Sequence, residues 1–268
     1  MLTATMAVSA LIGAGSPARA EPPPPNTWVV NWGEERCSLL RRAPGDDVRM
    51  FALRTVPGSY YWDLRIVDQG WRDSVFSNRR RLSVRLGPSG IQLPNAVTFE
   101  RTTLGRAVVL YQLDQEGLDM IAQGATLRVV RDDEPVFEMA LPNLAGALAA
   151  LRECEVAVLR DWGMDPVAYY AVRQPPRGNL AREIDDDDYP SSSADRNEQG
   201  LVVMRMTVGT NRRIEECAIL VSSGFEALDR RSCDIARIRF RPEPAIGADG
   251  APVRAPLVAS ITWRIVDL

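Results

Sequence analysis

The sequence predicts an α+β protein with an N-terminal β-rich, sandwich-like domain that carries one or two helices, followed by a small β-β-α-β domain. Two patterns support this prediction: short strand-like runs separated by turn residues, and one helical pattern that lies between strand patterns near the end of the chain. The length is a third observation, because 268 residues favour two domains over one.

The first twenty residues are typical of a secretory signal peptide. Residues 1–14 are apolar or small and uncharged, and Ala18-Arg19-Ala20 has the small-x-small pattern that signal peptidase cleaves. The alternative is an ordinary buried helix. We expect cleavage after Ala20, a Pro-rich spacer over residues 21–27, and a periplasmic mature protein without a stable membrane span, because no other apolar run is long enough for one.

The basic residues argue against most catalytic schemes. The chain has no His, and all 32 of its basic residues are Arg. A hydroxyl nucleophile therefore lacks its common general bases, and zinc lacks its commonest nitrogen ligand. With a net charge of only -3, nucleic acid is not an expected partner either. We expect no enzyme, no cofactor and no metal site. Glycan hydrolysis by two carboxylates stays open, with Asp63, Asp68, Asp114 and Glu116 as unranked candidates.

Four cysteines in an exported chain favour disulfides over free thiols. Three pairings exist. We predict Cys37 with Cys154 and Cys217 with Cys233, because each bridge then lies inside one domain. Four buried free thiols are the alternative.

Residues 28–173 form the predicted β-rich domain. Its expected strands are Trp28–Trp32, Val48–Thr55, Trp62–Val67, Arg81–Leu86, Val97–Thr102 and Val108–Leu113, broken by Gly and Pro turns. Helices are expected at Leu118–Gln123 and at Leu144–Leu159, whose apolar stripe points Cys154 inward. The basic run Arg79–Arg81 indicates a solvated strand end, with a glycan or phosphate contact as the alternative.

A linker is predicted over residues 174–188. Pro175, Pro176 and Gly178 precede four consecutive acids, Asp185–Asp188. A calcium loop alternates its ligands and needs a turn, so the run indicates a solvated, self-repelling connector.

Residues 189–268 form the predicted small domain. We expect strands at Leu201–Val208 and Ile214–Val221, a helix over Phe225–Ile238, and a last strand over Pro256–Val266. In that last strand, Leu257, Ala259, Ile261, Trp263 and Ile265 occupy alternate positions.

Several separated motifs carry a family resemblance over about residues 189–266. They are Tyr189-Pro190, Gly200-Leu-Val-Val, Val221-Ser-Ser-Gly224, Ala227-Leu-Asp229, Arg237-Ile-Arg-Phe-Arg-Pro242 and Ile261-Thr-Trp-Arg-Ile265. In order and spacing they resemble the TonB C-terminal domain. That resemblance implies a domain that adds an extended peptide of an outer-membrane transporter to a sheet edge, by β-augmentation. The implied partner-binding residues are Tyr189, Pro190, Leu257, Ala259, Ile261, Trp263 and Ile265.

Three departures from the family pattern shape the functional expectation. Asn211-Arg212 occupies the hairpin turn, Cys217 and Cys233 add a strand-to-helix staple, and the usual membrane anchor with its Pro-rich span is not expected. We therefore predict a periplasmic binding or adaptor protein. The alternatives are a TonB-type energy transducer that keeps residues 1–20 as an anchor and, less favoured, the glycan hydrolase. A homodimer through strand exchange also stays open.

Overall fold

The computed structural model describes residues 24–33, 36–45, 47–71, 82–87, 90–94 and 97–265. The predicted signal peptide, its cleavage site, the start of the spacer and Arg79–Arg81 lie outside the described residues. No helix within the described part is long and apolar enough to cross a membrane.

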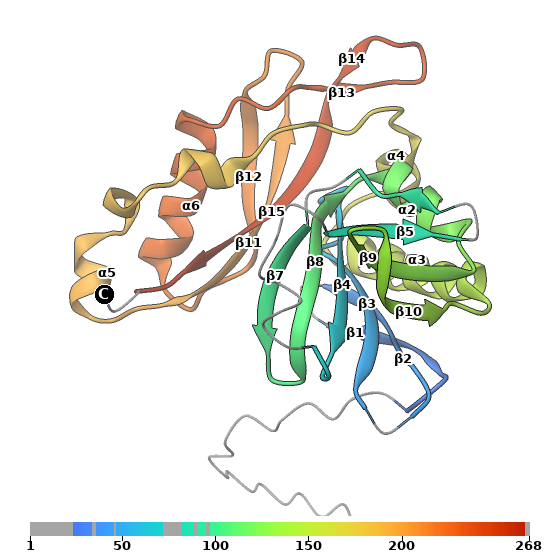
Figure 1. Ribbon diagram of the computed structural model, residues 1–268. Coiled ribbons are helices and arrows are strands. Elements are labelled where there is room, and N and C mark those ends of the chain that lie inside the picture. Colours follow the sequence, from blue (N-terminus) through green and yellow to red (C-terminus); the bar gives the residue numbers. More distant parts are fainter. Residues whose placement is uncertain are drawn as a thin grey trace, which may run out of the picture.

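The N-terminal part is built on two antiparallel sheets (Figure 1). The larger has the order β1-β2-β3-β4-β8-β7, with β1 Trp28–Trp32, β2 Cys37–Arg42, β3 Arg49–Thr55, β4 Trp62–Asp68, β7 Val97–Thr102 and β8 Gly105–Leu113. The smaller has the order β10-β9-β5-β6, with β5 Leu82–Leu86, β6 Ile91–Gln92, β9 Thr126–Arg131 and β10 Glu134–Ala140. Buried side chains of both sheets meet in one core, so the two sheets pack against each other.

Two helices complete this core. Helix α2 covers Gln115–Ala122 and is capped by Asp114, whose carboxylate accepts the N–H of Gly117. Helix α3 covers Leu144–Asp161 and buries Leu144, Ala147, Leu151, Cys154 and Val158 on the face that the sequence predicted. The disulfide between Cys37 and Cys154 ties β2 to α3, as predicted.

Four strands of this part were not predicted from the sequence. They are β2, which begins at Cys37, the two-residue strand β6, and the hairpin of β9 and β10. The hairpin turns at Asp132 and Asp133, whose φ angles are 50° and 67°. Such a turn needs positive φ at both central positions and usually contains Gly or Asn, so an Asp-Asp pair is a weak sequence signal for it.

The predicted linker is folded onto the C-terminal helix. Helix α4, Pro166–Ala171, leads through the short 3₁₀ turns η2, Leu180–Glu183, and η3, Asp186–Asp188, to α5, Ser191–Asp195. The prediction that the acidic run is solvated is wrong for Asp188, which is only 2% exposed. Its carboxylate is bound by Arg231 at 2.6 Å and by Arg239. The arginines neutralise this acid, so it does not repel the chain around it.

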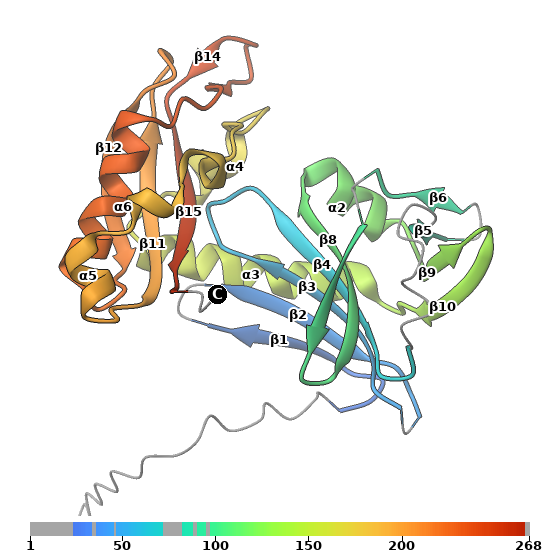
Figure 2. The same ribbon diagram turned by 60° about the vertical axis from the view of Figure 1, so that its left-hand side comes forward.

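The C-terminal sheet has the order β12-β11-β15, with β11 Gly200–Val208, β12 Ile214–Val221 and β15 Ala255–Trp263. Helix α6, Glu226–Ile238, covers the face that points away from the N-terminal sheets (Figure 2). The predicted order of two strands, one helix and a last strand is therefore present, with an extra ribbon of β13, Ala245–Ile246, and β14, Pro252–Val253, before β15. The second predicted disulfide, Cys217–Cys233, joins β12 to α6.

The other face of this sheet packs against the N-terminal part. Tyr60, Leu159 and Met164 share a core with Val203 and Val258. The guanidinium of Arg205 also donates to the carbonyl of Trp162, at 3.0 Å. The two parts are thus in direct apolar and polar contact.

One buried acid lies among these contacts and gives a pH prediction. Glu155 is 4% exposed and accepts hydrogen bonds from Trp62 Nε1 at 3.1 Å and the Tyr170 hydroxyl at 3.4 Å. Burial raises its pKa from 4.5 to about 7, partly opposed by the charge of Arg152. Between these values the folded state holds a proton that the unfolded state has lost. Stability should therefore fall as pH rises through this window, by about 1.4 kcal/mol per pH unit from this group.

Glu155→Gln should remove that part of the pH dependence. The measurement is urea unfolding of both proteins at several pH values from 5 to 8, compared as a difference so that other titrating groups cancel. Parallel curves for the two proteins would show that Glu155 ionises in the folded state as easily as in the unfolded chain.

Candidate functional site

Strand β15 has a neighbouring strand on one side only, because it ends the three-stranded sheet. It pairs with β11 along its whole length, from Gly200 opposite Trp263 to Val208 opposite Ala255. The N–H of Val258 donates instead to the carbonyl of Gly58, at 2.9 Å. In an antiparallel pair, the N–H and C=O groups of successive residues point alternately toward and away from the neighbouring strand. In β15 the backbone groups that point away from β11 belong to Pro256, Val258, Ser260 and Thr262.

One half of this edge is already protected. Pro256 has no N–H to offer, and the N–H of Val258 is bound by Gly58 in the turn between β3 and β4. Gly58 has a φ of +88°, and a Cβ on it would lie 2.4 Å from Cγ2 of Val258. Glycine is therefore required for this close contact between the two parts of the chain.

The other half of the edge is open. Ser260 and Thr262 are exposed, and among the described residues their outward N–H groups have no hydrogen-bond partner. Unpaired main-chain donors and acceptors along an exposed strand are the groups to which another strand can add.

The predicted partner-binding side chains mostly lie elsewhere. Leu257, Ile261 and Trp263 are buried on the α6 face of the sheet, and the indole N–H of Trp263 donates to Ser232 at 3.0 Å. Ala259 is half-buried on the same face, whereas Ile265, beyond β15, is exposed. The sequence pattern identified the apolar side of the strand, but that side faces the core, and the residues between these positions face outward.

Of the two N-terminal residues of the predicted site, Tyr189 contacts the strand through its ring. The Tyr189 ring packs edge-on against Trp263, with the ring centroids 5.3 Å apart, and its hydroxyl donates to the carbonyl of Glu198. Pro190 precedes α5 directly. Tyr189 thus packs against the end of β15, whereas Pro190 leads into α5.

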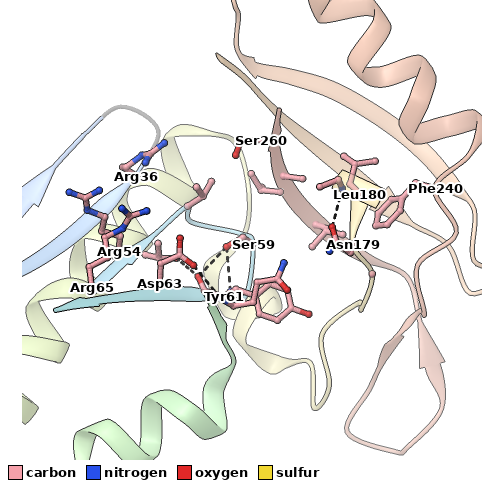
Figure 3. Close-up of a pocket in the computed structure, with 18 residues that line it drawn as sticks. Arg36, Arg54, Ser59, Tyr61, Asp63, Arg65, Asn179, Leu180, Phe240 and Ser260 are labelled. Atoms are coloured by element: carbon pink, nitrogen blue, oxygen red, sulfur yellow. Dashed lines mark hydrogen bonds between the residues drawn. The ribbon is translucent and has the colours of Figure 1, made fainter. Parts of the chain in front are cut away.

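A cleft of about 260 Å³ runs beside the edge (Figure 3). One wall is β15 from Leu257 to Ser260, and a second is the segment 178–181 together with Phe240. The third wall belongs to the N-terminal part and includes Arg36, Arg54, Ser59, Tyr61, Asp63 and Arg65. In Figure 3 the three arginines gather at one end, and Leu180 and Phe240 lie at the other.

The charged end stands on the outer face of the six-stranded sheet. Arg54 on β3 is directly opposite Asp63 on β4, and Arg65 is two residues further along β4. Arg65 forms an ion pair with Glu100, whose other oxygen is bound by the Tyr111 hydroxyl. Asp63 accepts the N–H of Gln112 at 3.2 Å, and burial raises the pKa of this carboxyl. The sequence alone does not predict this cluster, because its members come from different strands.

The four carboxylates considered for glycan hydrolysis are divided among three places. Asp63 lines the cleft, whereas Asp68 is paired with Arg49 at 3.1 Å. Asp114 and Glu116 line a second cavity of about 320 Å³ with Tyr60, Tyr61 and Tyr170. Of these two, Asp114 already serves as the cap of α2.

In a comparison with known families, the model described as Gram-negative bacterial TonB protein C-terminal matches residues 186–265. The predicted resemblance is therefore confirmed for this part of the chain, which forms a TonB C-terminal-like domain. This family is not an enzyme family; it is a periplasmic type of domain that mediates protein–protein interaction. Comparisons with curated proteins and with solved structures gave no match.

Proposed function

We propose that this chain is a periplasmic binding or adaptor protein whose open β15 edge pairs with an extended peptide of an envelope or outer-membrane partner. The observation that carries the proposal is the pair of exposed residues Ser260 and Thr262, whose outward main-chain groups have no partner among the described residues. Ser260 also lines the cleft. A peptide added there would gain main-chain hydrogen bonds from β15 and side-chain contacts from the cleft.

The proposal gives each part of the chain a role. Residues 189–268 act as the peptide-binding domain, with 174–188 as its docked connector. Residues 28–173, as a sandwich-like domain, protect the edge at Val258 and supply the opposite wall of the cleft. The protein reaches the periplasm after cleavage behind Ala20.

Energy transduction for outer-membrane transport is the second function, favoured by the family match. It requires a link to the inner membrane. Residues 1–20 could provide this link if they are not cleaved. Detection of Glu21 as the mature N-terminus would exclude this form of transduction and leave the adaptor proposal standing. A homodimer would use the same edge, and it would be visible as a concentration-dependent mass in sedimentation.

Ser260→Pro tests the proposed edge directly. Peptides are first selected on the full chain from a displayed library of random dodecapeptides, and their affinity is then measured by calorimetry. Proline removes the outward N–H of Ser260 but no hydrogen bond to β11, so the fold should tolerate it. Binding should weaken by about tenfold or more, since one main-chain hydrogen bond is lost and the ring obstructs the approaching strand.

The matched control is Ser260→Ala, which keeps the N–H and removes only an exposed hydroxyl. Its affinity should stay within about twofold of the wild-type value. Equal binding by the proline variant, with the fold verified by circular dichroism, would mean that the peptide docks elsewhere. A selection that enriches no peptide would refute the proposed function as a whole.

A further inference from the structure

We infer that the peptide carries an aspartate or glutamate side chain that pairs with Arg54, so that the N-terminal part of the chain selects the partner. This inference rests on the proposed function, and it assigns a specificity-determining residue outside the TonB C-terminal-like domain. Its basis is a half-buried arginine that has no direct ion pair with any described residue and lies in the wall that faces the open strand.

Arg54 has no ion pair and no side-chain hydrogen bond with any residue that the structure describes. It is half-buried, and burial together with the positive charges of Arg65 and Arg36 lowers its pKa, partly opposed by the negative charges of Glu100 and Asp63. Neither acid is hydrogen-bonded to it, so its guanidinium keeps N–H donors that a further carboxylate can accept. A carboxylate is the group that a guanidinium fork binds best, through two parallel hydrogen bonds.

The two described acids whose charge acts on Arg54 bind other groups directly. Asp63 accepts the N–H of Gln112, and Glu100 is held by Arg65 and by the Tyr111 hydroxyl. Among the charged residues that line the cleft, three are arginines and one, Asp63, is an acid. The cleft therefore carries an excess of positive charge that a negative guest would neutralise.

The form of the cleft favours a peptide over a small free anion. Arg54 and Ser260 line the same space, so a chain paired with β15 can place a side chain toward Arg54. At the opposite end Leu180 and Phe240 present apolar groups. An acidic residue at one end of the guest and an apolar residue at the other would match both ends, which no simple anion can do.

The same selection from random dodecapeptides, fused at their C-termini so that no free carboxylate ends them, tests the inference. It is run on the full wild-type chain, on Arg54→Gln, on Arg54→Lys and on Arg230→Gln. Arg230 is an exposed helix residue whose one ion pair among the described residues is with Glu226, so its variant controls for the loss of one positive charge. We expect acidic residues to be enriched at one position on the wild-type and Arg230→Gln proteins, and not on Arg54→Gln.

Calorimetry with one selected peptide and its Glu→Gln or Asp→Asn counterpart then measures the coupling. The acidic peptide should bind the wild-type chain about tenfold to a hundredfold more tightly than its amide counterpart does. The Arg54→Gln protein should bind the two peptides with equal affinity. Arg54→Lys should keep part of the preference, because it keeps the charge without the fork. The preference should also decline as salt is added.

Two results would overturn the inference in different ways. Peptides that bind the wild-type chain, lose affinity on Ser260→Pro and show no acidic preference would refute the role of Arg54 while the proposed edge stands. An acidic preference that survives in Arg54→Gln would assign the selection to another residue. Failure to enrich any peptide would overturn the inference together with the proposed function.

Discussion

Replacing Cys37 and Cys154 by alanine should lower the free energy of unfolding by about 4 to 5 kcal/mol. The two residues are 117 positions apart, so their bridge restricts a long stretch of the unfolded chain. In the chain-entropy account the stabilisation grows with the length of the closed loop, which makes this bridge the more important of the two. Urea unfolding followed by circular dichroism measures the change.

The matched control is the double alanine variant of Cys217 and Cys233, whose separation is 16. Its expected loss is smaller, about 3 kcal/mol, because the loop is shorter. Both variants also lose the packing of two buried or half-buried sulfur atoms. The difference between their free energies of unfolding therefore cancels part of this packing contribution. Equal losses for both variants would contradict the loop-length account and leave local packing as the main contribution.

Local patterns predicted the elements of this fold well where one face is apolar. The stripe of α3 from Leu144 and the alternation of β11 required only the spacing of apolar residues. Strand β2 was not predicted because its sequence, Cys-Ser-Leu-Leu-Arg-Arg, does not alternate between apolar and polar residues. Its first three residues are all buried, and it ends in two arginines. Here the tertiary environment, with sheet neighbours on both sides, outweighs the pattern.

The candidate site could be predicted in outline only. The resemblance identified β15 as the strand of interest, but it assigned the partner to the apolar set of alternate residues, which is the set that alternation places on the core face. The core set contains Leu257, Ile261 and Trp263, and the outward groups belong to Ser260 and Thr262. Arg54 is more than two hundred residues away in the sequence and reaches the cleft only because the two parts pack together.

The acidic run shows a different limit of sequence reasoning. Four consecutive aspartates repel one another in water, which favours a solvated connector unless cations gather around one of them. Arg231 on α6 and Arg239 at its end do so for Asp188. The carboxylate also accepts the N–H of Asp185 at 2.8 Å, so one residue joins the connector to the helix. The arginines are predictable as helix residues, but their partner is not.

Asp188→Asn should therefore destabilise the protein by about 3 kcal/mol. The amide keeps the size of the carboxylate but leaves the two arginines without their buried counter-charge, and loss of one partner from a buried ion pair typically costs 3–5 kcal/mol. We take the lower value because the arginine side chains are 39% and 34% exposed, and water can partly replace the lost partner. Asp187→Asn is the control: Asp187 is exposed, so the change there should be below about 0.5 kcal/mol.

The same variant has a defined pH dependence. Burial alone would raise the pKa of Asp188, but the hydrogen bonds from Arg239 and from the N–H of Asp185, together with the arginine charges, hold its pKa below the ordinary value of 3.8. A lowered pKa in the folded state adds stability that is fully present above 3.8 and is lost as pH falls through the folded pKa. The difference in unfolding free energy between wild type and Asp188→Asn should thus be constant near neutral pH and shrink in acid. A difference that instead grew in acid would mean that the aspartate is protonated in the folded protein, and the arginines would then need another counter-charge.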